Sequence, residues 1–538
     1  MELLIIVVLG LLVIAGSGVI GDRYGVAAPL VLVVVGIAVS LLPFTPEVEV
    51  EPELILAGLL PPLLYSAAVS VPTMNLRRDF GAVGGLSVVL VVVSSLALGA
   101  FFSWMIPGLD LAWGIALGAV ISPTDAAANA IAKRMGVAPR VMVILEGECL
   151  LNDATALVLL RTAVASAAAS FSLWETIGKF AFAVFAAVVI GVVVGHLNVY
   201  VRARVKDSAT NTILSFTVPF VASIPAEEIG ASGLVAAVVA GVVTGWHAPR
   251  DLSPQHRLSD SQNWHLVELV LEGTIFLLMG LELTAVIGDV RESDFGIASA
   301  VGIAAIALVL TIVIRAAYSA PLLRGLRRRS ERRQRIGPRL TQVRDALDDP
   351  DKIAEIEERA ARRRRRRTFD LERFRRRIRR MMADLDYFVE SPLTWRDGGL
   401  LVWAGMRGAV TVAAAQTLPE DAPHRSVLVL IAYTVATFSL LLQGGTLTTV
   451  VRMLRPSVPD PEVVRAERTE VLELLRAVKV PTDGMSSNQH SLALVRARRE
   501  ALLDARSEGE YGEESLTGAL ASLDAEEISL MSRGDPYS

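Results

Sequence analysis

Apolar residues in this chain form long runs that carry almost no charge, instead of recurring on one face of an amphipathic helix. A helix of about 20 apolar residues is long enough to cross a hydrocarbon core about 30 Å thick. The pattern therefore predicts an all-α polytopic membrane protein with about thirteen transmembrane helices. The predicted spans lie near residues 2–20, 26–43, 53–71, 80–105, 109–132, 140–168, 174–200, 211–226, 230–246, 265–288, 295–322, 398–418 and 425–451.

The charges between these spans alternate in sign from one loop to the next. Basic residues such as Arg77, Arg78 and Arg140 fall in every other loop, and the loops between them carry acids such as Glu47 and Asp110. Short loops rich in lysine and arginine stay in the cytoplasm. We therefore expect the amino terminus to lie outside and the carboxyl terminus to lie in the cytoplasm.

Composition supports this class and argues against several functions. Hydrophobic residues make up 52% of the 538 residues, and the net charge of -4 says little because basic and acidic residues are segregated along the chain. The sequence has no P-loop, no paired-cysteine metal pattern and no nucleophile elbow. It therefore predicts neither an enzyme nor a resident cofactor.

Two polar stretches lie outside the predicted spans. Residues 324–396 form a basic segment with the unbroken run Arg362–Arg367, and in the tail 456–538 two stretches, 463–479 and 491–507, have the pattern of amphipathic helices. We interpret the basic segment as a solvated cytoplasmic loop; contact with anionic lipid headgroups is the alternative, and nucleic acid is disfavoured. The tail is interpreted as solvated scaffold, with a regulatory or assembly role as the alternative.

Two predicted spans are interrupted near their centres. The fifth contains Pro123 within 122–125, and the twelfth contains the glycine-rich stretch 405–409. Unwound backbone at membrane depth is tolerated only where it is buried in protein or lines a wet cavity. Spans 4–6 and 11–13 could form an inverted repeat with two crossing discontinuous helices, an arrangement that points to the ion site of a transporter.

Asp153 lies inside the sixth span, where a carboxylate is costly unless it has a partner or a function. Burial favours the protonated form of a carboxyl group, so a proton and a dehydrated cation compete for the same oxygens. Exchange follows because the loaded site holds one or the other. We expect Asp153 to be the ion site, with a structural carboxylate as the alternative. Asn152 is expected to brace it rather than to act as a direct ligand.

Other polar residues near the first break have expected roles. Asp125 is expected to cap the second half-helix, and Thr124 could offer its main-chain carbonyl or hydroxyl to a cation. Glu146 and Glu148 precede Asp153 on the same span and are candidates for an ion funnel, with pairing to basic residues as the alternative.

Arg407 in the twelfth span requires an anionic partner, and Glu272 in the tenth is the most deeply placed acid that is available. We therefore predict a structural ion pair between them, with a direct gating role as the alternative. His247, His256 and His265 surround one loop and could sense pH, although exposed histidines without a special role are the preferred interpretation.

Five stretches together resemble bacterial sodium/proton antiporters of the monovalent cation:proton antiporter superfamily, in the NhaP-like branch related to the animal sodium/proton exchangers. They are Leu60–Leu64, Ser122–Ala126, Glu146–Asp153, Glu272–Phe276 and Gly405–Val410. The resemblance implies a homodimer in which a core domain moves against a dimerisation domain, within a transmembrane domain of residues 1–455. By position, the core comes from spans near 80–168 and 295–451, and the dimerisation part from 1–79 and 174–288.

The resemblance also implies that Asp153 binds the transported Na+ or a proton, with Asn152 in support and Thr124 lending backbone oxygen. Many members carry a serine ligand at the position of Cys149, and an acid near the position of Ser66. An asparagine directly before the aspartate goes with electroneutral exchange.

The expected function is therefore 1:1 electroneutral exchange of Na+ or Li+ for H+ by alternating access across the bacterial cytoplasmic membrane, in the service of pH homeostasis. A K+/H+ antiporter of the same fold is the alternative. A cation channel is disfavoured because it needs a continuous pore with a selectivity filter.

Overall fold

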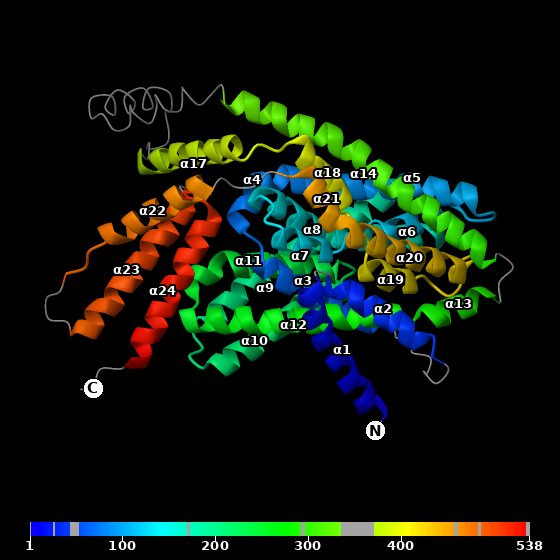
Figure 1. Cartoon of the computed structure of the whole chain (residues 1–538), viewed down its shortest axis with the longest axis horizontal. Coiled ribbons are helices and arrows are strands. Elements are labelled where there is room, and N and C mark those ends of the chain that lie inside the picture. The colour runs from blue at the N-terminus through cyan, green and yellow to red at the C-terminus, as the bar shows by residue number, and fades with distance from the viewer. Residues whose placement is uncertain are drawn as a thin grey trace. The chain divides into compact units, whose positions relative to one another are not determined.

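The computed structural model describes residues 2–24, 27–42, 53–168, 173–291, 296–334, 371–456, 461–481, 486–509 and 511–533, and these form helices joined by short connections (Figure 1). The predicted all-α fold class is confirmed. The chain divides into two compact units. The first comprises Met1–Leu322 and Trp395–Pro456, and the second comprises Leu323–Thr394 and Ser457–Ser538.

Every predicted span corresponds to one helix or to consecutive helices of the first unit. The chain passes from the first unit to the second within α14. In the described part of the chain, three short π-helical turns, η1 to η3, adjoin regular helices. The helices are α1 (Glu2–Tyr24), α2 (Ala28–Ser40), η1 (Leu54–Leu59), α3 (Leu60–Ser70), α4 (Thr73–Gly84), η2 (Gly85–Val89), α5 (Leu90–Met105), α6 (Leu111–Ile121), α7 (Ala127–Arg134), α8 (Pro139–Ala168), α9 (Leu173–Arg202), α10 (Ser208–Glu228), α11 (Gly233–Asp251), α12 (Pro254–Leu281), α13 (Leu283–Arg291), α14 (Ile297–Gln334), α18 (Trp395–Trp403), α19 (Ala409–Gln416), α20 (Arg425–Ser439), η3 (Leu440–Gly444) and α21 (Gly445–Leu454).

Length and apolar composition identify the helices that can cross a membrane. Among the described residues, 6 helical stretches satisfy both criteria, and further shorter apolar helices include Leu54–Ser70 and Leu111–Ile121. The predicted spans near 109–132 and 398–418 are each divided into two shorter helices, α6 with α7 and α18 with α19, as a broken helix requires. The count of thirteen spans stays a prediction.

Close packing of α5 on α6 fixes the position of the first broken span. A Cβ atom on Gly118 would lie 2.5 Å from Ser95 O, and one on Gly114 would collide with Gly99 O. Only glycine permits this approach of two helix backbones. The packing therefore holds the end of α6, from which the interrupted segment begins.

The second unit contains a basic helix and a helical tail. Helix α17 (Leu371–Glu390) belongs to the basic segment, whose arginine run 362–367 lies outside the described residues. The tail helices are α22 (Pro461–Ala477), α23 (Ser487–Glu508) and α24 (Glu513–Arg533). They share a core that includes Val471, Val495, Leu502, Leu516 and Leu520.

Helix α17 is attached to the end of α23. Arg380 Nε donates to Ser507 O at 2.7 Å, and Arg379 forms a 3.0 Å ion pair with Glu508. Cations are favoured at a helix carboxyl terminus. The basic segment and the tail, which were predicted as separate parts, therefore belong to one unit.

Candidate functional site

The two interrupted helices meet at their breaks. The chain leaves the helical conformation between α6 and α7, and again between α18 and α19. Asp125 N donates to Met406 O at 2.8 Å, so a backbone hydrogen bond joins the two unwound segments. Arg407 N donates to Ser439 Oγ at 2.8 Å, which attaches the second segment to α20. Backbone groups exposed by the breaks thus find partners inside the protein, as burial demands.

Asp125 faces the amino termini of two half-helices. Its Oδ1 accepts a 2.8 Å hydrogen bond from the amide of Ala127, the first residue of α7. The same carboxylate lies against Gly408, directly before α19, and interacts with the amide of Ala409. A negative charge is favoured at a helix amino terminus, where unpaired N–H groups point outward. One carboxylate therefore serves both half-helices.

Arg407 has the complementary role at the carboxyl ends. Its Nε donates to Ile121 O, the last residue of α6, at 3.0 Å, and its Nη1 donates to Gly405 O just beyond α18. These are the carbonyl groups left without intrahelical partners by the breaks. Asp125 and Arg407 together offset the charges that four half-helix ends expose.

The side chains of α8 approach the first break from one side. Asn152 Nδ2 donates to Thr124 Oγ1 at 2.5 Å, and Cys149 Sγ donates to Thr124 O at 3.2 Å. Asp153 follows Asn152 directly and is only 3% exposed. The structure thus brings Asn152 and Cys149 against Thr124, with Asp153 next along α8; these are four of the five residues that the sequence proposed for the ion site.

Two oxygens of this cluster lack a hydrogen-bond partner in the described part of the chain. Among the described residues, neither Asp153 Oδ1 nor Asn152 Oδ1 forms a hydrogen bond, although both are buried. The neighbouring charge that acts on the Asp153 carboxyl belongs to another acid, Asp125. Carboxylate, amide, hydroxyl and carbonyl oxygens are hard ligands that suit alkali-metal cations. The arrangement can therefore accept either a cation or a proton.

The ion pair predicted between Glu272 and Arg407 is not formed among the described residues. The Arg407 guanidinium instead donates to main-chain carbonyl groups that the breaks expose. The acid near the crossing that does pair with an arginine is Glu148, with Arg315 of α14. The partners in this sequence prediction were therefore wrong.

Glu148 and Arg315 form a buried bidentate pair. Arg315 Nη2 donates to Glu148 Oε2 at 2.7 Å and Nη1 donates to Oε1, while Nε donates to Leu401 O at 2.8 Å. The pair joins α8, α14 and α18 around the crossing. Because Glu148 is fully engaged and buried, it does not line an accessible funnel, which corrects that sequence interpretation.

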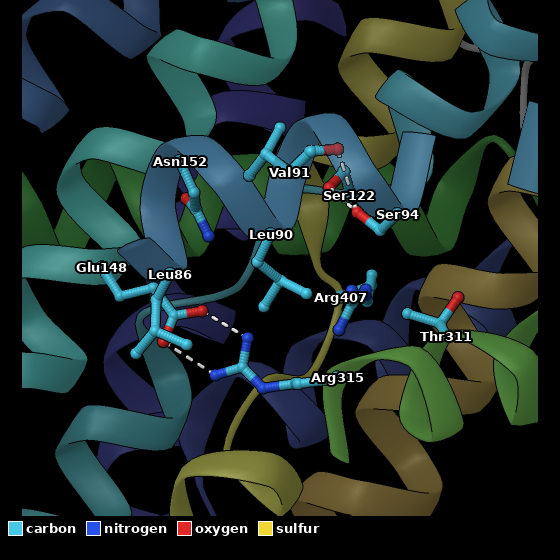
Figure 2. Close-up of a pocket in the computed structure, with 10 residues that line it drawn as sticks. All are labelled: Leu86, Leu90, Val91, Ser94, Ser122, Glu148, Asn152, Thr311, Arg315 and Arg407. Atoms are coloured by element: carbon cyan, nitrogen blue, oxygen red, sulfur yellow. Dashed lines mark hydrogen bonds and ion pairs between the residues drawn. The ribbon is translucent and has the colours of Figure 1, made fainter. Parts of the chain in front are cut away.

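A small polar cavity separates this ion pair from the crossing (Figure 2). Its volume is about 10 Å³, on the scale of a single water molecule. Ser94 Oγ and Ser122 Oγ lie 2.9 Å apart on its wall. Its other lining residues are Leu86, Leu90, Val91, Glu148, Asn152, Thr311, Arg315 and Arg407.

Three half-buried acids lie on α8 and α12. Glu146 interacts electrostatically with Lys133 and with Glu268, and Glu272 interacts with Glu268 and with Asp125. Glu268 was not predicted as a site residue, although its spacing of one helical turn from Glu272 indicates a shared helix face. These electrostatic interactions form a series from the amino-terminal part of α8 to Asp125 at the crossing.

Comparison with known proteins identifies a family for this chain. A family model described as "Sodium/hydrogen exchanger, transmembrane" matches residues 7–347. A protein of Mycobacterium tuberculosis named as a Na(+)/H(+) exchanger is 27% identical over 99% of this chain and 97% of its own length. A Bacillus pumilus protein named "Sodium, potassium, lithium and rubidium/H(+) antiporter" is 31% identical over 53% of this chain and 44% of its own length.

A solved structure has the same overall fold. The sodium proton antiporter MjNhaP1 from Methanocaldococcus jannaschii at pH 8 superposes with a TM-score of 0.57 at 14% identity, and the match covers 84% of this chain and 99% of that one. At this identity the likeness supports the fold alone.

Proposed function

Because the chain belongs to the transmembrane sodium/hydrogen exchanger family, we propose that it exchanges Na+ or Li+ for H+ across a bacterial cytoplasmic membrane. The resemblance found in the sequence motifs is thereby confirmed. The family is one of membrane transporters, and its members are antiporters rather than enzymes. The observation that carries the proposal is Asp153, a buried carboxylate with an unpaired oxygen at the meeting point of two broken helices.

Exchange at this site results from competition for Asp153. Its carboxylate holds a proton in one loaded state and a cation in the other. Thr124 offers its carbonyl and hydroxyl oxygens to the cation, and Asn152 holds Thr124 in place through its amide. The Cys149 thiol donates to Thr124 O, and the second lone pair of that carbonyl oxygen stays available to a cation.

Alternating access would follow if the crossing moves as a unit. The core from spans near 80–168 and 295–451 would move against a dimerisation part from 1–79 and 174–288, within a homodimer. The hydrogen bonds that join the two breaks support such rigid movement because they tie both half-helix pairs together. The amino terminus would lie outside and the carboxyl terminus in the cytoplasm. Anionic lipid is a candidate partner of the basic segment.

We further propose 1:1 electroneutral exchange. A single carboxylate that loses one proton before it accepts one monovalent cation has the same charge in both loaded states. Asn152 cannot ionise, and Ser66 takes the position where many relatives carry an acid. A K+/H+ antiporter is the second candidate, favoured by the name of the Bacillus pumilus relative.

Proteoliposomes with a pre-formed pH gradient test this function. We expect Na+ and Li+ to dissipate the gradient in a saturable and reversible manner, and K+ added separately decides between the two candidate cations. Asp153→Asn should abolish exchange without loss of fold. Glu282→Gln is the matched control, because Glu282 is also buried but accepts from Gln416 at the carboxyl end of α19, opposite to the break. Near-normal transport by Asp153→Asn would place the ion site elsewhere.

A further inference from the structure

His256 lies in the first turn of α12 and is only 7% exposed, in contrast to the exposed histidine that the sequence favoured. Its two ring nitrogens both have partners on other elements. Nδ1 lies 3.2 Å from Asn211 Nδ2 of α10, and Nε2 lies 3.3 Å from the carbonyl oxygen of Lys206. The imidazole thus bridges α12 to the turn between α9 and α10.

The orientation of the Asn211 amide is fixed by Arg202. Arg202 Nε and Nη2 donate to Asn211 Oδ1 at 2.8 and 2.6 Å, and a guanidinium can only donate. Asn211 Nδ2 donates to Arg202 O at 2.9 Å, and a carbonyl can only accept. The amide cannot flip without losing all three bonds, so the second Nδ2 hydrogen points to His256.

The protonation state of His256 follows from this orientation. Because Asn211 Nδ2 donates, His256 Nδ1 must accept and must carry no proton. Because Lys206 O accepts, His256 Nε2 must carry the proton of the neutral ring. Protonation of Nδ1 would set two donors against each other at 3.2 Å. The neutral imidazole fits this network, and the imidazolium does not.

Charges of both signs surround the ring, so they do not decide its state by themselves. Arg202 is 1% exposed and is paired with Asp260, one turn after His256 on α12. Asp207, at the start of α10, and Asp260 both act on His256 through their charges. Hydrogen bonds from Thr210 lower the pKa of Asp207, so that acid stays ionised. The Lys206 side chain is exposed.

The same network holds three helices together. Arg202 Nη1 and Trp264 Nε1 both donate to Ser215 Oγ, at 3.2 and 2.9 Å. The Trp264 ring packs on Tyr65 of α3 with 5.1 Å between ring centroids. His256 lies at one end of this buried network. Loss of its contacts with Asn211 and Lys206 would therefore weaken the packing of α12 against α10 and the α9–α10 turn.

We propose that His256 is a pH-sensitive switch that locks the α9–α10 turn to α12 when it is neutral and releases this turn when it is protonated. Histidine is the side chain that ordinarily changes charge between about pH 5 and 8. The lock thus closes at neutral and alkaline pH and opens in acid. The inference does not depend on which cation the protein transports.

Hydrogen–deuterium exchange of the full chain in detergent tests the switch, with rates corrected for the pH dependence of exchange itself. In the wild type we expect amides of residues 204–212 to exchange on the order of tenfold faster at pH 5.5 than at pH 7.5, the effect of losing one buried hydrogen bond. His256→Gln should remove this difference because its amide can accept from Asn211 at any pH. His265→Gln, an exposed histidine on the same helix, is the matched control and should behave as wild type.

Asn211→Asp provides a test with the opposite sign. An aspartate accepts from Arg202 and also from a protonated His256, so the turn should be better protected at pH 5.5 than at pH 7.5. A wild-type turn without pH dependence overturns the proposal. So does an unchanged difference in His256→Gln. If His256→Gln fails to fold, the sign measured in Asn211→Asp decides alone.

Discussion

The carboxylate of Asp125 lies directly against the Cα atom of Gly408, so that a Cβ atom on Gly408 would overlap Asp125 Oδ2. This contact brings the amino terminus of α19 onto the acid that also caps α7. The Asp125 carboxylate therefore joins the two breaks, and it fits there because Gly408 has no side chain. The contact explains why the second break needs a glycine at this position.

Gly408→Ala should disrupt the crossing. The added methyl group must displace Asp125 or separate the two segments, and we expect a loss of about 3 kcal/mol of stability, at the upper end for overpacked buried sites. Thermal unfolding in detergent measures the loss. Gly445→Ala is the matched control because a Cβ atom there meets no neighbour within 4 Å. Equal melting temperatures for the two variants would contradict this account of the crossing.

The buried pair of Glu148 and Arg315 makes a second prediction. Arg315→Ala leaves Glu148 buried without its partner and should cost about 3–5 kcal/mol. Adding Glu148→Gln should recover part of this loss, because the remaining side chain is then uncharged. A double-mutant cycle of unfolding free energies gives the coupling energy. A double variant no more stable than Arg315→Ala would show that the pair does not act as a unit.

Hydropathy and charge alternation could predict the fold class, because long apolar helices and basic loops are properties of local sequence. Both breaks could also be predicted, because Pro123 and the glycines around Arg407 are local signals of an interrupted helix. The partner of Glu148 could not be found in this way, since Arg315 lies 167 residues away and meets it only after three helices pack. Glu272 was paired with Arg407 because the sequence could not reveal that main-chain carbonyl groups occupy that guanidinium.

The tail shows a different kind of omission. Helix α24 was not predicted, although Leu516, Leu520 and Leu523 recur at helical spacing and enter the core of the second unit. His256 could not be separated from His247 and His265 by sequence, because its burial depends on the packing of α10 against α12.

Cys149→Ser should change cation preference. The serine hydroxyl is a harder ligand than the thiol and sits beside Thr124 O. We expect the apparent affinity for Na+ and Li+ to rise severalfold relative to that for K+. Apparent KM values in proteoliposomes, measured for each cation separately, check this. An unchanged ratio would show that Cys149 does not contact the cation.

Membrane voltage should not drive the exchange. If one cation replaces one proton at Asp153, no net charge moves, whereas a net charge would experience about 2.3 kcal/mol per 100 mV. The measurement is Na+ exchange in proteoliposomes with a valinomycin-set potential of either sign. We expect the same rate and the same final Na+ ratio. A ratio that shifts with voltage would indicate a second titrating acid, such as Glu146, Glu272 or Asp125.

Competition between cation and proton at Asp153 is measured most directly by proton release. Purified protein in weak buffer is titrated with Na+ or Li+ while the pH is recorded. The account predicts release of about one proton per bound cation, an apparent cation affinity that falls as the pH falls, and no release from Asp153→Asn, while Glu282→Gln behaves as wild type. Proton release from Asp153→Asn equal to that of wild type, or none from wild type, would contradict it.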